Sequence, residues 1–270
     1  MIGLLTELPA FELGGVSLLG NPWLDLGLLL VAGFAAGVIN SMAGGGSFLI
    51  LPLLVGLGLP ANVANGTTRI GVISQSIAAI ATFRRKGVDT GRLSLRLAPA
   101  MLLGALLGSW LATQITDAAF KPVIGAVLIA WAILLLVKPD RFLRPPDHER
   151  PPSAITHVLC GLIGVYGGFL QAGVGFPLLA MLSGHLGYDL VRSNSTKVTL
   201  TLAFTLIALP VFIYADQIAW TPALVLAATT MLGAWAGVRW QLDKGSEVVR
   251  WFVVVMVAVS GTAMLISALR

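Results

Sequence analysis

Long apolar runs separated by short polar breaks occupy almost the whole of this 270-residue sequence. Only 11% of the residues are charged, whereas soluble globular domains carry about 25%. Such a chain cannot cover a globular surface with solvated groups, so its outer surface must face lipid. Because a helix needs about 20 residues to cross a bilayer, the runs predict an all-α polytopic membrane protein with about ten transmembrane or half-membrane segments. We expect these segments at residues 24–42, 46–58, 66–83, 93–114, 120–137, 154–171, 174–185, 194–214, 219–240 and 248–268.

Two of these segments, 46–58 and 174–185, are too short to cross a bilayer, and each follows a glycine cluster. Short, glycine-interrupted segments at corresponding places in two halves of a chain are typical of discontinuous helices around a transport site. We therefore expect the site where the two glycine clusters lie.

The second half of the sequence repeats the first at one constant offset. Asn65 and Thr67 recur as Asn194 and Thr196, 129 residues later, and the glycine clusters correspond at the same offset. An internal repeat of this kind predicts two related structural units. The expected organisation is a first transmembrane repeat over 1–137, a cytoplasmic linker over 138–153 and a second transmembrane repeat over 154–270.

The distribution of Lys and Arg predicts the orientation of the halves. Residues 1–68 contain neither, whereas the 84–96 region contains five and the 138–153 linker contains four. Cytoplasmic loops of membrane proteins are enriched in these residues. The 214–221 loop corresponds to the basic 84–96 region but contains no Lys or Arg. Equivalent loops are therefore expected on opposite sides, which makes the repeat inverted, with both termini outside.

The glycine clusters are candidate anion sites. Glycine interrupts a helix, and a short helix that restarts after it presents N–H donors and a partial positive charge. The alternative is that the glycines only allow close helix packing. The candidate residues are Asn40, Ser41, Gly44, Gly45, Gly46 and Ser47 in the first cluster, and Gln171, Gly173 and Gly175 in the second.

A polar cluster that ends in a base opens a long apolar segment in each half. The side chains are Asn65, Thr67, Thr68 and Arg69 in the first half, and Asn194, Ser195, Thr196 and Lys197 in the second. One interpretation is that Asn or Ser caps the helix while the base reaches the membrane surface. The other is that the bases attract an anion and the hydroxyls and amides donate hydrogen bonds to it. The bases are not repeat equivalents, because Lys197 corresponds to Thr68.

Other features of the sequence narrow the class of function. Gln75 is a further candidate for the pathway, or a polar contact between helices. The pairs Gly104/Gly108 and Gly233/Gly237 are typical of helix packing, within one subunit or in a homodimer. No catalytic His or Ser motif occurs, and few acidic residues lie within the apolar runs. We therefore expect no enzyme activity, no metal and no cofactor. The formal charge of +5 comes from bases in short loops, which indicates topology rather than nucleic-acid binding.

Four motifs together resemble a known family. They are Ala-Gly-Gly-Gly at 43–46, Asn-Gly-Thr-Thr-Arg at 65–69, Gln-Ala-Gly-Val-Gly at 171–175 and Asn-Ser-Thr-Lys at 194–197. Over most of its length the chain is similar to the sulfite exporter TauE/SafE family. The resemblance implies a secondary transporter of the bacterial inner membrane that handles sulfite, sulfonates or related small anions. An anion channel, a membrane-embedded enzyme and an assembly partner are the alternatives.

Overall fold

Every regular element in the described part of the chain is a helix. The computed structural model describes residues 21–42, 44–88, 91–137 and 148–244. In chain order the elements are α1 (Pro22–Met42), α2 (Ser47–Gly56), α3 (Ala61–Arg85), α4 (Gly91–Gln114), α5 (Asp117–Val137), α6 (Ala154–Phe169), α7 (Gly175–Leu179), the π-helix η3 (Ala180–His185), α8 (Leu190–Tyr214) and α9 (Trp220–Lys244). A helix occupies each expected segment from 24–42 to 219–240. The expected segment 248–268 and most of the linker lie outside the described residues.

Four helices of the described part, α1, α4, α8 and α9, are long and apolar enough to cross a membrane. Large apolar side chains are exposed on their outer faces, among them Val31, Leu103 and Leu224. Exposed apolar surface of this extent is unfavourable in water and favourable in lipid. The chain is therefore a multi-pass membrane protein.

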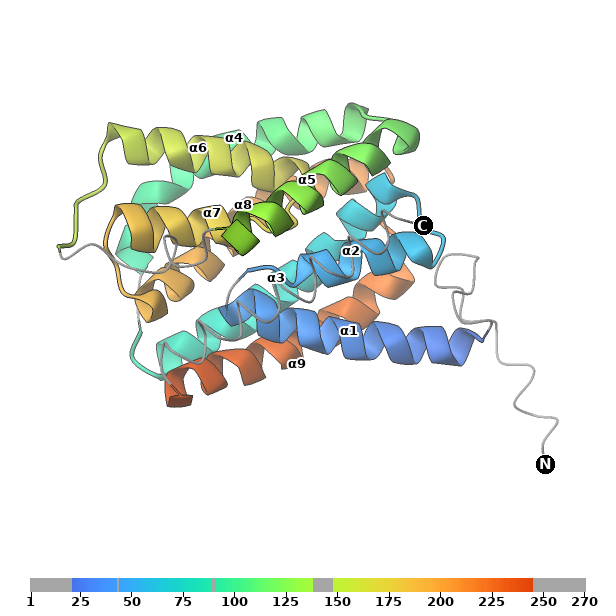
Figure 1. Cartoon of the computed structure of the whole chain (residues 1–270), viewed down its shortest axis with the longest axis horizontal. Helices are drawn as coiled ribbons and strands as arrows, with labels where there is room; N and C mark the ends of the chain where they lie inside the picture. Colours follow the sequence, from blue (N-terminus) through green and yellow to red (C-terminus); the bar gives the residue numbers. More distant parts are fainter. Residues whose placement is uncertain (1–20, 43, 89–90, 138–147, 245–270) are drawn as a thin grey trace.

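The long helices form two packed pairs with further helices between them. Figure 1 shows α1 beside α9 along one edge and α4 beside α6 along the opposite edge, with α3 packed on α9 and α8 packed on α4. Small residues make the paired helices approach closely. A Cβ added at Gly104 would lie 2.1 Å from the Gly161 carbonyl oxygen, and one added at Gly233 would lie 2.1 Å from the Phe34 carbonyl oxygen. The expectation that these glycines pack helices together is confirmed within one chain.

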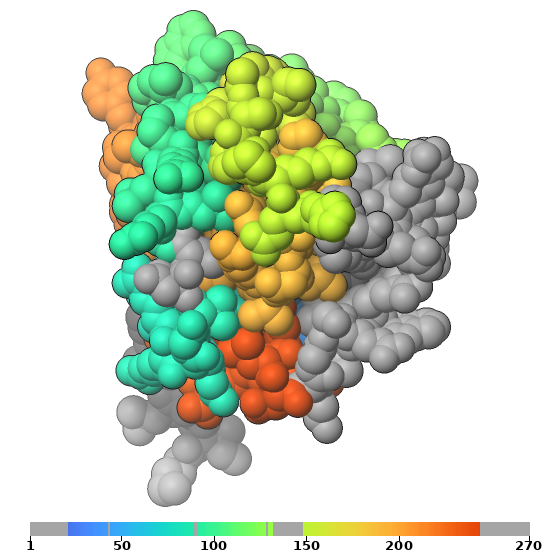
Figure 2. All heavy atoms as spheres, turned by 90° about the vertical axis from the view of Figure 1, so that its left-hand side faces the viewer, coloured from blue at the N-terminus to red at the C-terminus, as the bar shows by residue number. Residues whose placement is uncertain are grey.

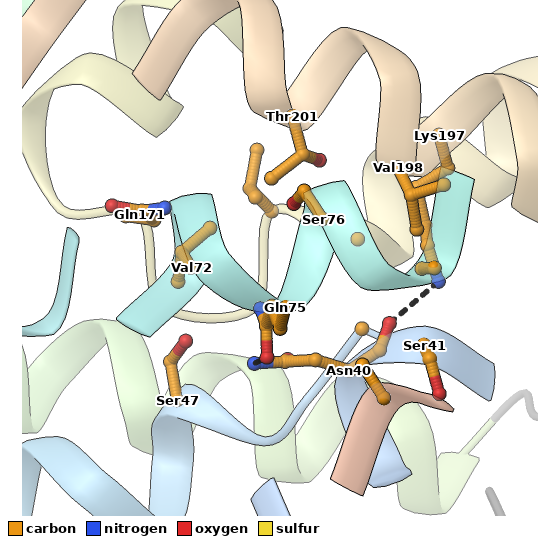
Figure 3. A pocket seen from close by; sticks show the side chains of 15 residues that line it. Asn40, Ser41, Ser47, Val72, Gln75, Ser76, Gln171, Lys197, Val198 and Thr201 are labelled. Carbon is orange, nitrogen blue, oxygen red and sulfur yellow. Dashed lines mark hydrogen bonds between the residues drawn. The ribbon is translucent and has the colours of Figure 1, made fainter. Parts of the chain in front are cut away.

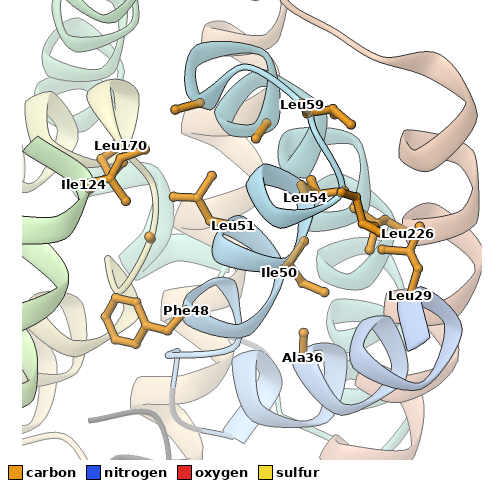
Figure 4. Close-up of a cluster of buried hydrophobic side chains, with 14 of the residues drawn as sticks. Leu29, Ala36, Phe48, Ile50, Leu51, Leu54, Leu59, Ile124, Leu170 and Leu226 are labelled. Carbon is orange, nitrogen blue, oxygen red and sulfur yellow. The ribbon is translucent and has the colours of Figure 1, made fainter. Parts of the chain in front are cut away.

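The short helix α2 is wrapped by a large apolar core. Its Ile50, Leu51 and Leu54 are buried in one cluster with Leu29 of α1 and Leu226 of α9 (Figure 4). A separate cluster joins α4, α6, η3 and α8. Each short segment is thus surrounded by the long helices, and the glycine break before it lies inside the protein.

The helices α3 and α8 correspond residue for residue and run in opposite directions. Their bounds, 61–85 and 190–214, differ by the repeat offset at both ends. Gly66, near the start of α3, lies against Phe212, near the end of α8. Phe83, near the end of α3, shares a cluster with Val198, near the start of α8. The ribbon in Figure 1 follows the same antiparallel course.

One end of the molecule gathers the ends of α3 and α9 and the starts of α4, α6 and α8; Figure 2 views this end. Two ion pairs tie its segments together. The Lys86 Nζ lies 3.6 Å from a carboxylate oxygen of Asp243, and the Arg192 Nη1 lies 2.8 Å from a carboxylate oxygen of Glu149. Exposed pairs of this kind contribute little stability, but they show that the end of α3 lies beside the end of α9, and the start of α8 beside the residues that precede α6.

Candidate functional site

The two glycine clusters form the breaks in the chain that precede α2 and α7. At these two glycine breaks the chain segments cross in direct backbone contact. A Cβ added at Gly44 would lie 2.4 Å from the Gly175 Cα, and one added at Gly175 would lie 2.4 Å from the Gly44 Cα. Gly44 has a φ of +101°, which L side chains rarely adopt. Beside the crossing, the rings of Phe48 and Phe176 stack with their centroids 5.9 Å apart. The clusters therefore meet at one point, and no larger residue fits at this point.

Asn40, in the last turn of α1, connects the first break to both α3 and α8. Its Oδ1 accepts a hydrogen bond from the Gly46 N–H at 2.8 Å, and its Nδ2 donates to the Gln75 Oε1 at 3.3 Å. Its backbone carbonyl accepts from the Lys197 Nζ at 2.9 Å (Figure 3). Asn40 thus forms hydrogen bonds with a backbone amide of the break, with the Gln75 side chain of α3 and with the buried Lys197 of α8.

The polar clusters lie within their helices rather than at the starts. The residue that precedes α3 is Pro60, and the N-cap of α8 is Asp189. Arg69 and Lys197 are 0% and 2% exposed, so neither side chain reaches the membrane surface. The cap-and-surface interpretation is therefore wrong. Helix formation begins earlier than the apolar run because Pro60 and Asp189 start the helices. Buried partners bind several polar atoms of the clusters, while the Asn65 Oδ1 and the Arg69 Nε have no partner among the described residues.

The cluster of the first half holds the end of α6. The Asn65 Nδ2 donates to the Phe169 carbonyl at 2.8 Å. The Arg69 guanidinium donates to the Gly168 carbonyl and, at 3.3 Å, to the Gly167 carbonyl. The last carbonyls of a helix have no partner within the helix and carry a partial negative charge. A cation and an amide donor at this end are therefore stabilising.

The cluster of the second half holds the end of α1 in the same way. The Asn194 Nδ2 donates to the Met42 carbonyl at 2.8 Å. The Lys197 Nζ donates to the Asn40 carbonyl and, at 2.7 Å, to the Asn194 Oδ1. Each half thus clamps the first helix of the other half by an Asn and a base.

Arg69 and Lys197 differ in their surroundings beyond these hydrogen bonds. The Arg69 guanidinium carbon lies 4.1 Å from the centroid of the Phe212 ring, a favourable cation–π distance, and Arg69 lines neither described cavity. Lys197 lines the larger cavity. Within the described residues no carboxylate lies within ion-pair distance of Lys197.

The larger cavity has about 390 Å³ of empty space, including its opening, and lies between α1, the breaks, α3 and α8. Eight of the candidate residues line it: Asn40, Ser41, Gly44, Ser47, Gln75, Gln171, Gly175 and Lys197. Thr68 lines a smaller neighbouring cavity. The remaining candidates line neither cavity: Gly45, Gly46, Asn65, Thr67, Arg69, Gly173, Asn194, Ser195 and Thr196.

Several lining residues were not candidates in the sequence. Ser76 and Thr201 are polar, and Val72, Ala79, Val174, Val198 and Ala234 are apolar. The available signal was helical spacing, because residues three and four apart share a helix face. Thr201 follows Lys197 by four residues, and Val72 and Ala79 are each within four residues of Gln75.

The cavity presents hydrogen-bond donors that the described part of the chain leaves unused. The Ser47, Ser76 and Thr201 hydroxyls form no hydrogen bond with any described residue, although each side chain lines the cavity. Gln171 differs, because its Nε2 donates to the Thr205 Oγ1 at 3.1 Å and its Oε1 has no partner among the described residues. A buried cation with unused donors around it is suited to bind a small anion.

Comparison with known proteins identifies the family. The family model described as sulfite exporter TauE/SafE matches residues 29–264. The chain belongs to the sulfite exporter TauE/SafE family. Among curated TauE/SafE relatives, the "probable membrane transporter protein ORF9" of Sinorhizobium sp is 27% identical over 86% of this chain and 88% of its own. A "probable membrane transporter protein" of Haemophilus influenzae is 28% identical over 86% and 91%, and the "probable membrane transporter protein YfcA" of Escherichia coli is 29% identical over 89% of each chain.

These TauE/SafE relatives are named as transporters, which agrees with a membrane protein that surrounds a polar internal cavity. Among the described residues of this member, no three His, Cys, Asp or Glu side chains come together as a group that could hold a metal ion. Its polar cavity is built instead from amides, hydroxyls and one ammonium group.

Proposed function

We propose that the chain is a secondary transporter that exports a small anion, such as sulfite or an organosulfonate, across the bacterial inner membrane. In this proposal the anion binds in the larger cavity, and two inverted halves give it access to each side in turn. The family is named after sulfite export, which motivates the choice of sulfite as substrate.

The burial of Lys197 without a charged partner in the described part of the chain is the observation that carries the proposal. This side chain is 2% exposed, and its Nζ donates only to neutral oxygens, those of Asn40 and Asn194, among the described residues. A charged side chain at membrane depth is costly and usually marks a substrate or ion pathway. An anion in the cavity would balance the Lys197 charge and accept hydrogen bonds from Ser76 and Thr201 beside it.

The arrangement of helices supports alternating access. The antiparallel α3 and α8 each carry an Asn and a base, and each clamps the first helix of the other half. The pairs α4–α6 and α1–α9 are equivalent under the repeat offset. Inverted-topology repeats whose discontinuous helices meet near the midplane are a common basis of alternating access.

Uptake of labelled sulfite into proteoliposomes tests the proposal. We expect saturable uptake and counterflow by the wild-type protein, because a carrier exchanges substrate across the membrane while a channel shows no counterflow. Lys197→Gln removes the charge but keeps donors for the Asn40 and Asn194 oxygens. It is expected to abolish saturable uptake, whereas Lys197→Arg retains part of it.

Lys121→Gln is the matched control, because Lys121 is half exposed and its only ion-pair partner among the described residues is Asp117 at the start of α5, at 3.0 Å. It is expected to transport like the wild type. Uptake by a folded Lys197→Gln protein that equals wild type would overturn the assignment of the charge. Absence of uptake of sulfite, thiosulfate, taurine and sulfoacetate by the wild type would overturn the proposed class of substrate.

A further inference from the structure

A second cavity adjoins the first and has no assigned role. It has about 230 Å³ of empty space and lies between α1, α2, α3 and α9. Four residues line both cavities: Asn40, Ser47, Val72 and Gln75. The two spaces therefore meet at a shared wall that contains three polar side chains.

On both α3 and α9, the second cavity lies about one helical turn closer to the N-terminus of the helix than the first cavity. On α3 the second cavity begins at Thr68 and the first ends at Ala79. On α9 the second is lined by Leu226 and Thr230 and the first by Ala234. One turn advances about 5.4 Å along a helix axis. The cavities therefore follow one another along the direction of the helices, as successive parts of a path do.

The repeat adds an independent argument. Thr68 is the residue of the first half that corresponds to Lys197. Lys197 lines the first cavity and Thr68 lines the second. Equivalent positions of the two halves thus face consecutive spaces, which is the arrangement expected of a path that passes between inverted halves.

A chain of hydrogen bonds fixes the shared wall. The Gly46 N–H donates to the Asn40 Oδ1, which settles the orientation of this amide, so its Nδ2 donates to the Gln75 Oε1. The Gln75 Nε2 has no partner among the described residues and is left as a free donor at the junction. Figure 3 shows the two amide groups facing one another.

The two cavities differ in what they offer an anion. In the second, the Thr68 hydroxyl already donates to the Asn65 carbonyl at 2.8 Å, and the Thr230 hydroxyl has two carbonyl acceptors, Leu226 at 2.6 Å and Gly71 at 2.8 Å. Their hydrogen atoms are thus used within the protein, and no cation of the described part of the chain lines this space. The unused Ser47 hydroxyl and the free Gln75 Nε2 both lie at the shared wall, so an anion would bind in the first cavity, which Lys197 lines, and only pass through the rest of the second. Transport requires sites that bind an ion weakly enough to release it.

We propose that the second cavity continues the transport path, and that the hydrogen-bonded pair Asn40–Gln75 is the gate between its two compartments. The inference rests on the proposed function for the nature of the passing solute. The barrier itself is a property of the shared wall, so it can be tested with an anion that is not the substrate.

The test is a passive chloride leak, measured with an entrapped chloride-sensitive dye in proteoliposomes. Gln75→Ala removes the side chain that meets Asn40, and we expect the leak to rise about tenfold over wild type, equivalent to a barrier lowered by about 1.4 kcal/mol. Val198→Ala is the matched control, because Val198 lines the first cavity only. It enlarges this cavity without opening the wall, and its leak is expected to equal wild type.

Melting temperatures of the purified variants establish that both are folded. A folded Gln75→Ala protein without increased leak would overturn the gate. An equal increase in Val198→Ala would also overturn it, because cavity volume rather than the wall would then limit the leak. Saturable sulfite uptake by the wild type is measured in the same vesicles, so that a failure of the proposed function is seen separately from a failure of the gate.

Discussion

In the proposed function, single hydrogen-bond donors determine how strongly the larger cavity binds the anion. Ser76 and Thr201 lie one helical turn or less from the two polar side chains that the sequence singled out, Gln75 and Lys197. Their hydroxyls are unused by the described part of the protein, so in the bound state each would donate to the anion. Hydrogen bonds to charged groups contribute about 1.5–3 kcal/mol each.

Removing one hydroxyl should therefore weaken binding without disturbing the fold. Thr201→Val replaces the hydroxyl by a methyl group of similar size, and we expect sulfite affinity to fall about tenfold or more. A sulfite-dependent shift of the melting temperature measures this affinity. Thr113→Val is the control, because the Thr113 hydroxyl is remote from the cavity and donates to the Trp110 carbonyl. Equal affinities of Thr201→Val and wild type would show that the hydroxyl does not contact the anion.

Arg69 is expected to affect stability more than binding. Its guanidinium satisfies the Gly167 and Gly168 carbonyls at the end of α6, and Arg69→Met leaves them unpaired. Each unsatisfied buried acceptor costs about 1–3 kcal/mol, so the melting temperature should fall clearly. Arg69→Lys keeps a donor and should restore part of the loss. If sulfite affinity falls as far in Arg69→Met as in Lys197→Gln at unchanged stability, Arg69 is instead a charge that acts on the anion.

The two broken helices depend on each other at the level of whole elements. The breaks that precede α2 and α7 touch through glycine backbones, so neither segment can move toward the other without displacing it. This contact joins the two halves at the wall of the larger cavity, which Gly44 and Gly175 both line.

A methyl group at the crossing should separate the breaks. Gly44→Ala places a Cβ 2.4 Å from the Gly175 Cα and also forces a positive φ on alanine. We expect a loss of folded protein or a large fall in melting temperature. Gly27→Ala is the matched control: Gly27 lies within α1, where an added Cβ meets nothing within 4 Å, and alanine should stabilise the helix by about 1 kcal/mol. A Gly44→Ala protein that melts like Gly27→Ala would contradict the close crossing.

The elements were largely predictable, whereas the roles of the two bases were not. The offset of 129 and the glycine clusters predicted both short segments, and α3 and α8 obey the offset at both ends. Arg69 and Lys197 differ from equivalence by one residue, which rotates a side chain by about 100° around a helix axis. Which of the two bases faces the cavity depends on how α6 packs against Arg69 and α1 against Lys197, and this packing could not be predicted from the sequence. The π-helix η3 was also unpredicted, since a single i+5 turn has no pattern distinct from an α-helix.

Charge is distributed unevenly between the two ends of the molecule. Arg84, Arg85 and Lys86 end α3 at the end shown in Figure 2, where Arg150 and Arg192 also lie. The α8–α9 connection at the opposite end contains Asp216 and neither Lys nor Arg, and the start of α5 there contains Lys121 paired with Asp117. The excess of bases at cytoplasmic loops predicts that the basic end faces the cytoplasm. If the two halves are inverted, as the sequence predicts, equivalent residues must lie on opposite sides of the membrane.

The last residues of α3 and α8, Arg85 and Tyr214, are equivalent positions and test this directly. Both side chains are exposed, and Cys160 is the one cysteine of the sequence, so Cys160→Ala gives a background without thiols. In this background an impermeant maleimide added to intact cells should label Tyr214→Cys and not Arg85→Cys. Permeabilising the cells should add labelling of Arg85→Cys, since its loop would then be reached from the cytoplasm. Labelling of both from one side would contradict the inverted halves, because α3 and α8 would then end at the same surface of the membrane.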